Sequence, residues 1–353
     1  MKNKIRVLIV EDSPTSQGLL RGILSEDPGF EVIGTATDGE QAIEFVIKKH
    51  PDVVSMDIYM PVMDGVVATR QIMKQSPVPI VIVSSFYTPA EVKMSFKILE
   101  AGALTILPKP FGPGHPQYHQ SAKHYRNTLK MMSEIKLSAR HENQTVITKA
   151  KIEAPIVRPA SGFTRENKKI VAIGASAGGP LAIQIILKGL PKNFPLPVLI
   201  VQHIDTNFAS GFCDWLNTTS NLPVHIAKDG ETLLPGHVYL APGDHHIGLK
   251  QEGVVSITKD IPEKGLRPAV SYLFKNIAKI YAKSAVCILL SGMGTDGATE
   301  LLTLRQKGAF TIAQDANSSL VHGMPGEAIR LGGACVVLSP EDIVKELNKI
   351  LIQ

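Results

Sequence analysis

The sequence is poor in cysteine and in long hydrophobic runs. Its 353 residues include three cysteines, Cys213, Cys287 and Cys335, with no CxxC spacing. This pattern argues against a disulfide framework and favours reduced core thiols over a redox or zinc site. No apolar run approaches the ~20 residues of a membrane-spanning helix, and the amino terminus has no signal-peptide pattern. We therefore expect a cytoplasmic protein with no direct membrane insertion.

The formal net charge of the chain is +5, but most of the chain has no surplus of basic residues. The segment from Gly112 to Lys169 carries 11 basic and 4 acidic residues, which leaves 26 basic and 28 acidic residues elsewhere. This excess indicates either a solvated linker or a docking strip for an acidic partner. A DNA-binding role is disfavoured, and no nucleic-acid partner is expected.

Length and pattern predict two α/β domains, because one hydrophobic core stops growing at about 250–300 residues. Short β-branched runs alternate with amphipathic segments over residues 1–117, which favours a small doubly wound sheet. A helix over Tyr118–Leu137 is expected to leave this domain and to open a linker that ends at residue 168. Residues 169–353 predict a second doubly wound, mostly parallel sheet, with β-hairpins inserted over His237–Lys259. The strands expected in the two sheets are Ile5–Val10, Glu31–Ala36, Val53–Met56, Ile80–Val83 and Leu104–Leu107, then Ile170–Ile173, Val198–Val201, Ala285–Leu290 and Phe310–Ala313.

Polar residues follow the strands of the first predicted sheet. Glu11 and Asp12 follow the first strand, Asp57 the third, Ser84 the fourth and Lys109 the fifth. Because the carboxyl ends of parallel strands form one edge, these side chains are expected to converge. A lone aspartate after a strand is usually a helix cap, but five such positions in register indicate a site. The three carboxylates suit Mg²⁺. Together, Mg²⁺ and the Lys109 ammonium would neutralise the negative charge of a phosphoryl group as it passes to Asp57.

These motifs resemble the response-regulator receiver family. The matching strings are Glu11-Asp12, Asp57-Ile58-Tyr59-Met60-Pro61 with Met63-Asp64-Gly65, and Lys109-Pro110. The resemblance implies a flavodoxin-like (βα)5 fold, phosphorylation of Asp57 by a histidine kinase, support of the phosphoryl group by Ser84 and Lys109, and a cis peptide at Lys109-Pro110. Ile106 replaces the aromatic switch residue of many receivers, which leaves open how the signal spreads.

A second motif, Gly174-Ala175-Ser176-Ala177-Gly178-Gly179, follows the first strand of the second domain. It allows two interpretations. In a dinucleotide-binding G-x-G-x-x-G loop the central glycine lets a pyrophosphate approach, and here Ser176 occupies that position. In a G-x-S-x-G nucleophile elbow, Ser176 is exposed on a strand-to-helix turn, and the N–H groups of Ala177 and Gly178 face a developing oxyanion.

A serine nucleophile needs a base, and two other strand ends supply candidates. His203 follows the next strand, and Asp296 lies in a glycine-rich loop after a later strand, where it could orient the imidazole. His245 and His246 form a rival pair, expected on a loop near the cleft and able to contact substrate.

The second domain resembles the catalytic domain of the chemotaxis protein-glutamate methylesterase (CheB-type) family. The matching strings are Ile173–Gly179, Gln202-His203-Ile204, Leu240–Gly243, Arg267-Pro268, Ser291–Gly297, and Ala313–Asp315 with Gly323–Pro325. The resemblance implies a Ser176, His203 and Asp296 triad with Met293 in the active site. Ala177 replaces a threonine found in many members, so no side-chain role is assigned there.

The same resemblance implies an activity and its partners. The activity is phosphorylation-activated removal of γ-methyl esters from glutamates on chemoreceptor helices, with deamidation of receptor glutamines. It uses Mg²⁺ in the receiver and no cofactor in the catalytic domain. The alternative is a non-enzymatic adaptor whose esterase-like domain only binds a partner.

Overall fold

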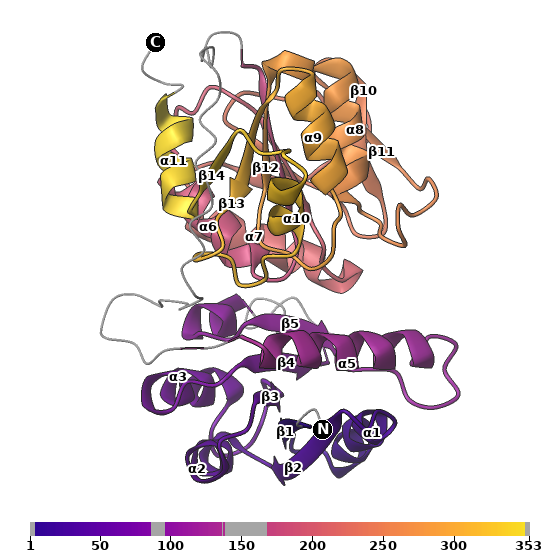
Figure 1. The fold of residues 1–353 in the computed structure, drawn as a ribbon, viewed down its shortest axis with the longest axis vertical. Coiled ribbons are helices and arrows are strands. Elements are labelled where there is room, and N and C mark those ends of the chain that lie inside the picture. The colour runs from indigo at the N-terminus through magenta and orange to yellow at the C-terminus, as the bar shows by residue number, and fades with distance from the viewer. Residues whose placement is uncertain (1–3, 86–95, 136, 138–167, 350–353) are drawn as a thin grey trace. The chain divides into compact units, whose positions relative to one another are not determined.

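The chain is described from a computed structural model over residues 4–85, 96–135, 137 and 168–349 (Figure 1). It divides into two compact units, Met1–Lys149 and Ala150–Gln353. Each unit is built around a parallel β-sheet. Within the described ranges, no helix has both the length and the hydropathy needed to cross a membrane. The domain boundaries expected at residues 117 and 168 remain predictions.

The first unit contains a five-stranded parallel sheet with the order β2-β1-β3-β4-β5. This order is that of the flavodoxin-like fold, as predicted. The strands lie within one residue of their expected positions. They are β1 (Ile5–Val10), β2 (Phe30–Ala36), β3 (Val53–Met56), β4 (Ile80–Ser84) and β5 (Thr105–Pro108). The helices of this unit include α1 (Pro14–Ser25), α2 (Gly39–Lys49), α3 (Gly65–Gln75) and α5 (Tyr118–Ser133).

Three helices of this unit begin at polar caps that immediately precede them. Ser13, Asp38 and Asp64 each accept a hydrogen bond from a backbone N–H in the first turn of α1, α2 and α3. Such caps satisfy donors that have no partner inside the helix. Each helix therefore starts close to the carboxyl edge of the sheet, where the predicted site residues lie.

Helix α5 differs from its sequence-based prediction. The sequence predicts a helix that leaves the first domain, whereas α5 contacts β3, β4 and α1. The buried Tyr125 hydroxyl donates to Ser55 Oγ at 2.9 Å, and Arg126 pairs with Glu26 at 2.6 Å. The apolar face of the helix thus covers this sheet, and the helix ends at Ser133, before Leu137.

The second unit contains a seven-stranded sheet with the order β14-β13-β12-β6-β7-β9-β8, and all its pairings are parallel. The strands are β6 (Ile170–Ala175), β7 (Val198–Gln202), β8 (Val224–Ile226), β9 (Val238–Leu240), β12 (Ala285–Leu289), β13 (Phe310–Gln314) and β14 (Val336–Leu338). The α-helices are α6 (Gly179–Gly189), α7 (Ala209–Thr219), α8 (Val270–Ile280), α9 (Ala298–Gln306), α10 (Met324–Arg330) and α11 (Pro340–Asn348). The predicted doubly wound fold is confirmed.

The central strands of this sheet are buried along their whole length, because helices cover both faces. In the register, Ala175 of β6 pairs with Gln202 of β7, and Gly174 pairs with Leu289 of β12. The carboxyl ends of β12, β6 and β7 are therefore adjacent. The three cysteines are free and buried, as expected.

The region over residues 237–259 was predicted as hairpins inserted into the main sheet, which is only partly correct. A hairpin of β10 (His246–Gln251) and β11 (Val254–Thr258) is present, but it forms a separate two-stranded sheet. The preceding strand β9 joins the main sheet in parallel, beside β7. Its three-residue length gives too little periodicity to distinguish these arrangements from sequence.

Candidate active site and phosphorylation site

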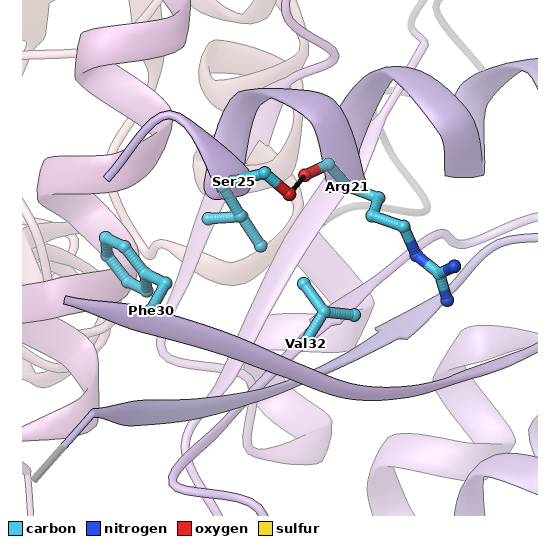
Figure 2. Close-up of a pocket in the computed structure, with 5 residues that line it drawn as sticks. Arg21, Ser25, Phe30 and Val32 are labelled. Atoms are coloured by element: carbon cyan, nitrogen blue, oxygen red, sulfur yellow. Dashed lines mark hydrogen bonds between the residues drawn. The ribbon is translucent and has the colours of Figure 1, made fainter. Parts of the chain in front are cut away.

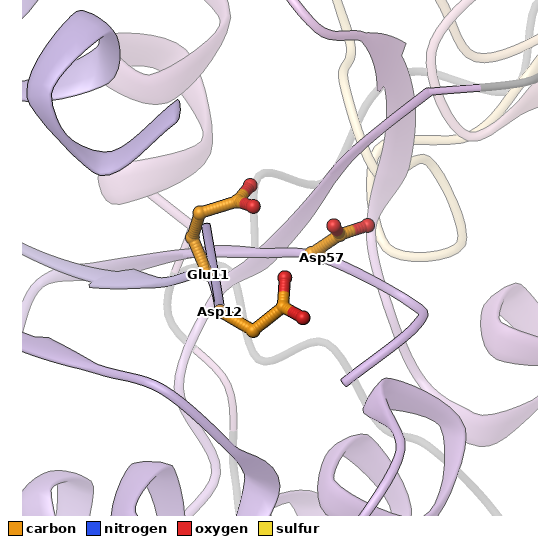
Figure 3. A group of neighbouring side chains, drawn as sticks. All are labelled: Glu11, Asp12 and Asp57. Carbon is orange, nitrogen blue, oxygen red and sulfur yellow. The ribbon is translucent and has the colours of Figure 1, made fainter. Parts of the chain in front are cut away.

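Three carboxylates gather at the carboxyl edge of the first sheet (Figure 3). Each of Glu11, Asp12 and Asp57 offers an oxygen within 4.8 Å of the others. Glu11 and Asp57 are buried, whereas Asp12 is exposed. Such an oxygen-rich, partly open group matches the ligand chemistry of a hard divalent cation that retains water.

Ser84 and Lys109 both reach Asp57. The Ser84 hydroxyl donates to Asp57 Oδ1, and Lys109 Nζ lies 2.7 Å from Asp57 Oδ2. The N–H of Ile58 donates to Asp57 Oδ1 at 2.6 Å. The five residues predicted from strand ends therefore form one cluster. The prediction of a cis peptide at Lys109-Pro110 is wrong. This bond is trans, and the cis peptide bond found among the described residues is Arg267-Pro268.

The electrostatics of this cluster favour a further positive charge. Burial raises the pKa of Glu11; hydrogen bonding to Lys109 lowers it, and the charge of Asp57 raises it again. Although burial lowers the pKa of Lys109, hydrogen bonds to Asp57 and Glu11 bring it above its ordinary value. Glu11 Oε2 lies 2.7 Å from Lys109 Nζ but accepts no well-aligned hydrogen bond from any described residue. That buried oxygen fits a metal ligand.

The turn after β6 presents Ser176. Gly178 has a φ of +79° and caps α6, which begins at Gly179. A Cβ at Gly178 would lie 2.5 Å from Leu320 Cβ, so both the conformation and the space require glycine. The Ser176 N–H donates to Ser291 O at 3.0 Å, and the Gly179 N–H donates to Ser176 O at 2.8 Å. The loop is thus a tight strand-to-helix turn, the local geometry of a nucleophile elbow.

His203 and Asp296 form a buried pair. His203 Nε2 lies 2.9 Å from Asp296 Oδ2, and their side chains are 12% and 2% exposed. Asp296 also accepts the backbone N–H groups of Val270 at 2.6 Å and Ser271 at 3.0 Å, at the amino terminus of α8. Burial alone would raise the pKa of Asp296, but hydrogen bonds from His203 and Ser271 lower it to about 2. The carboxylate is therefore ionised at neutral pH and holds Nε2–H, which leaves Nδ1 as the nitrogen able to accept a proton.

The three candidate catalytic residues follow adjacent strands, β6, β7 and β12. The His203 N–H donates to Ala175 O at 2.9 Å, which ties the base to the strand that ends at the nucleophile. A Cβ at Gly292 would lie 2.8 Å from Ser176 Cβ, so the loop that carries Asp296 passes directly beside Ser176. Met293, in the same loop, is 42% exposed. Among the described residues, the N–H groups of Ala177, Gly178 and Met293 have no hydrogen-bond acceptor.

The rival histidines, His245 and His246, do not take part in the pair formed by His203 and Asp296. His246 is 0% exposed, stacks on Tyr272 with ring centroids 4.2 Å apart, and accepts the Ala269 N–H at 3.3 Å. His246 is therefore too buried to act as the rival substrate contact; it packs against the start of α8. His245 is partly exposed and lies 2.8 Å from Gly243 O through Nδ1.

Sequence reasoning missed several supporting residues. Gln202 and Ser291 make hydrogen bonds to the backbone of the elbow, and Gln314 accepts the Ser291 N–H at 2.8 Å. The available signal was their position at or just past the ends of β7, β12 and β13, beside the catalytic candidates.

A pocket of about 280 Å³ lies in the first unit, and none of its lining residues belongs to the acidic cluster (Figure 2). It is lined by Arg21, Leu24 and Ser25 of α1 and by Phe30 and Val32 of β2. Ser25 Oγ donates to Arg21 O at 2.8 Å, so this hydroxyl is already satisfied within α1. Phe30 pairs with Ile5 at the amino ends of the strands, opposite the acidic cluster.

Both units of the chain match known protein families. Residues 171–347 match the family described as CheB methylesterase, and residues 7–116 match the response regulator receiver domain. A Geobacter metallireducens protein named protein-glutamate methylesterase/protein-glutamine glutaminase 4 is 48% identical over 353 residues, and the match covers 99% of each chain. This chain belongs to the CheB methylesterase family.

Further relatives of this CheB family member are similarly close. A Nitrosospira multiformis protein named protein-glutamate methylesterase/protein-glutamine glutaminase is 49% identical over 351 residues, which cover 99% of this chain and 98% of the relative. The crystal structure of the Thermotoga maritima CheB methylesterase catalytic domain is 40% identical, with a TM-score of 0.50, and covers 53% of this chain and 99% of that one. These named relatives are methylesterases, which supports the hydrolase interpretation over the non-enzymatic adaptor.

We expect Asp296 to make the second unit of this CheB family member sensitive to acid. Its pKa falls from 3.8 when unfolded to about 2 when folded, so its stabilisation is complete above about pH 4 and is lost as the pH falls toward 2. This shift corresponds to about 2 kcal/mol. Urea unfolding followed by fluorescence of Trp215, the only tryptophan and a buried residue of α7, reports this unit. Asp296→Asn should flatten this acid dependence; an unchanged slope would contradict the assignment.

Proposed function

We propose that this chain is a phosphorylation-activated protein-glutamate O-methylesterase that also deamidates protein glutamines. It would act on methylated helices of a chemoreceptor. The observation that carries the proposal is the His203–Asp296 pair at 2.9 Å, at the sheet edge where the Ser176 elbow emerges. Family membership supports it, since close relatives carry both activities in their names.

The proposed reaction begins with attack by Ser176 Oγ on the ester carbonyl. His203 Nδ1 takes the hydroxyl proton while Nε2–H remains on Asp296, which stabilises the imidazolium. The N–H groups near Ala177 and Met293 would receive the oxyanion. Collapse of the tetrahedral intermediate breaks the ester C–O bond, and His203 returns the proton so that methanol leaves. Water then attacks the acyl-enzyme with the same base, which releases the glutamate carboxylate and restores Ser176; with glutamine, ammonia leaves instead of methanol.

We propose that Asp57 accepts the phosphoryl group from a histidine kinase. Glu11, Asp12 and Asp57 would hold Mg²⁺, which when bound supplies positive charge beside the incoming phosphoryl oxygens. Lys109 Nζ and the Ser84 hydroxyl contact Asp57 and would pair with these oxygens. The buried free cysteines suit a reducing compartment, so we also propose a cytoplasmic location.

The control by phosphorylation can be tested with the full chain. Acetyl phosphate with Mg²⁺ should raise the rate of methanol release from a methylated receptor by about 5–150-fold, the usual range of allosteric coupling. Asp57→Asn or chelation of Mg²⁺ should remove this stimulation and leave the basal rate. Asp52→Asn is a matched control, because Asp52 precedes β3 at the end opposite Asp57. Equal stimulation of wild type and Asp57→Asn would refute this site.

A further inference from the structure

Gln202 makes direct contact with the backbone of two candidate catalytic residues. It is the last residue of β7 and is 5% exposed. Its Nε2 donates to Ser176 O at 2.8 Å and to His203 O at 3.0 Å. One side-chain amide therefore joins the strand end that carries the nucleophile to the strand end that carries the base.

The hydrogen bonds of the Gln202 side chain lie at the end of the pairing between β6 and β7. The Cα register of β6 and β7 ends at the pair Ala175 and Gln202, one residue before Ser176 and His203. Beyond it, the His203 N–H still donates to Ala175 O at 2.9 Å. The amide of Gln202 adds two more hydrogen bonds past this point. It limits how far the backbones of Ser176 and His203 can separate.

The chemistry of the amide matches this position. Two carbonyl oxygens converge on Nε2, and a primary amide nitrogen offers two N–H groups from one atom. A carboxylate of the same shape would only accept, and a thioether would provide no comparable donor. Gln202 thus has the side chain that can bridge two acceptors in a space of this size.

The other end of the amide argues against a role in burial alone. Gln202 Oε1 accepts no hydrogen bond from any described residue, and it lies 2.3 Å from where a Cβ at Gly179 would stand. A buried acceptor without a donor destabilises a fold. An apolar side chain of similar volume would avoid that cost, so the two donated hydrogen bonds are the feature that requires glutamine.

We propose that Gln202 is a positioning residue that sets the distance between Ser176 and His203, an inference that rests on the proposed esterase function. Gln202 is only 5% exposed, so it would act through the backbones of Ser176 and His203 and not by contact with substrate. Its loss would shift the serine relative to the imidazole. A misplacement of about 1 Å can lower the rate of a chemical step by about 10²-fold.

Two substitutions test this role in the full chain. Gln202→Met keeps the volume and removes both donors, and Gln202→Glu replaces both donors with acceptors. We expect kcat for methanol release to fall by about 10²-fold in Gln202→Met and further in Gln202→Glu, with little change in KM. Labelling of Ser176 by a fluorophosphonate should slow in the same order. Rates are expressed per folded molecule, measured by Trp215 fluorescence, so that a loss of folded protein is not read as a loss of chemistry.

Asn221→Leu is the matched control. Asn221 Nδ2 also donates to two carbonyls, Lys188 O at 2.9 Å and Leu190 O at 3.1 Å, but these belong to the carboxyl end of α6. This variant should keep the wild-type kcat. Wild-type kcat per folded molecule in Gln202→Met, with wild-type enzyme active, would overturn the positioning role. Absence of methanol release by the wild-type chain would instead refute the proposed function.

Discussion

Replacing Ser176 with alanine is expected to lower kcat for methanol release by about 10⁶-fold, the loss typical of removing a serine nucleophile. The Ser291 hydroxyl, in the loop beside Ser176, is not free to substitute for it, because Ser291 Oγ donates to Ala177 O at 2.7 Å. The Ser176 side chain makes no hydrogen bond to the described residues, so the fold should persist. Methanol release and Trp215 fluorescence measure the two effects separately.

Ser256→Ala provides the control for this experiment. Ser256 lies in β11 of the separate hairpin, which belongs to the same unit but not to the main sheet. The activity of the Ser256→Ala variant should equal that of wild type. Residual activity of Ser176→Ala above about one percent of wild type, with the receptor fully methylated at the start, would remove Ser176 as nucleophile and with it the proposed mechanism.

Asp296→Asn is expected to lower kcat by about 10⁴-fold, as when a triad aspartate becomes an amide. Asp296 Oδ2 accepts from both His203 and the Val270 N–H, and Oδ1 accepts from the Ser271 N–H. An asparagine has one acceptor oxygen, and if the Ser271 N–H holds it, the NH₂ group stands where Oδ2 was and the Val270 N–H loses its acceptor. The NH₂ group would then face His203 Nε2 and move the ring proton to Nδ1, the nitrogen that must accept the serine proton.

The control here is Asp229→Asn. Asp229 pairs with Lys250 at 2.7 Å on the exposed side of the same unit, and we expect wild-type kinetics from it. A loss of less than about tenfold in Asp296→Asn would show that the imidazole is oriented by other groups. Mass spectrometry of the variant should precede the assay, because an asparagine that reverts to aspartate would restore activity.

Much of the site could be predicted because it lies at strand ends. Asp57 and Ser176 follow buried strands whose β-branched runs are readable in the sequence, and parallel strands bring such ends to one edge. The same reasoning could not find β9, whose three residues give no periodicity, or the docking of α5, since an amphipathic face does not name the surface that it covers.

The remaining errors concern contacts that depend on side-chain geometry. His246 follows a turn in the sequence and was expected near the cleft. In the structure it packs against the start of α8, where its Nδ1 accepts a hydrogen bond from the Ala269 N–H. In the sequence, Gln202 appeared only as part of a motif. Its side chain donates to Ser176 O, 26 positions earlier in the chain, and to His203 O of the next residue. A local sequence pattern indicates neither of these hydrogen bonds. The strand ends supplied the candidates Ser176, His203 and Asp296, and the resemblance to a family implied that they form a triad.

Covalent capture of the nucleophile tests directly whether Ser176 is the group that attacks the ester. The full chain is treated with a fluorophosphonate, digested, and analysed by peptide mass spectrometry while methanol release is followed in parallel. We expect one adduct, on Ser176, formed at the rate at which activity is lost and slowed strongly in Asp296→Asn. An adduct on another serine, or full loss of activity with Ser176 unmodified, would contradict it.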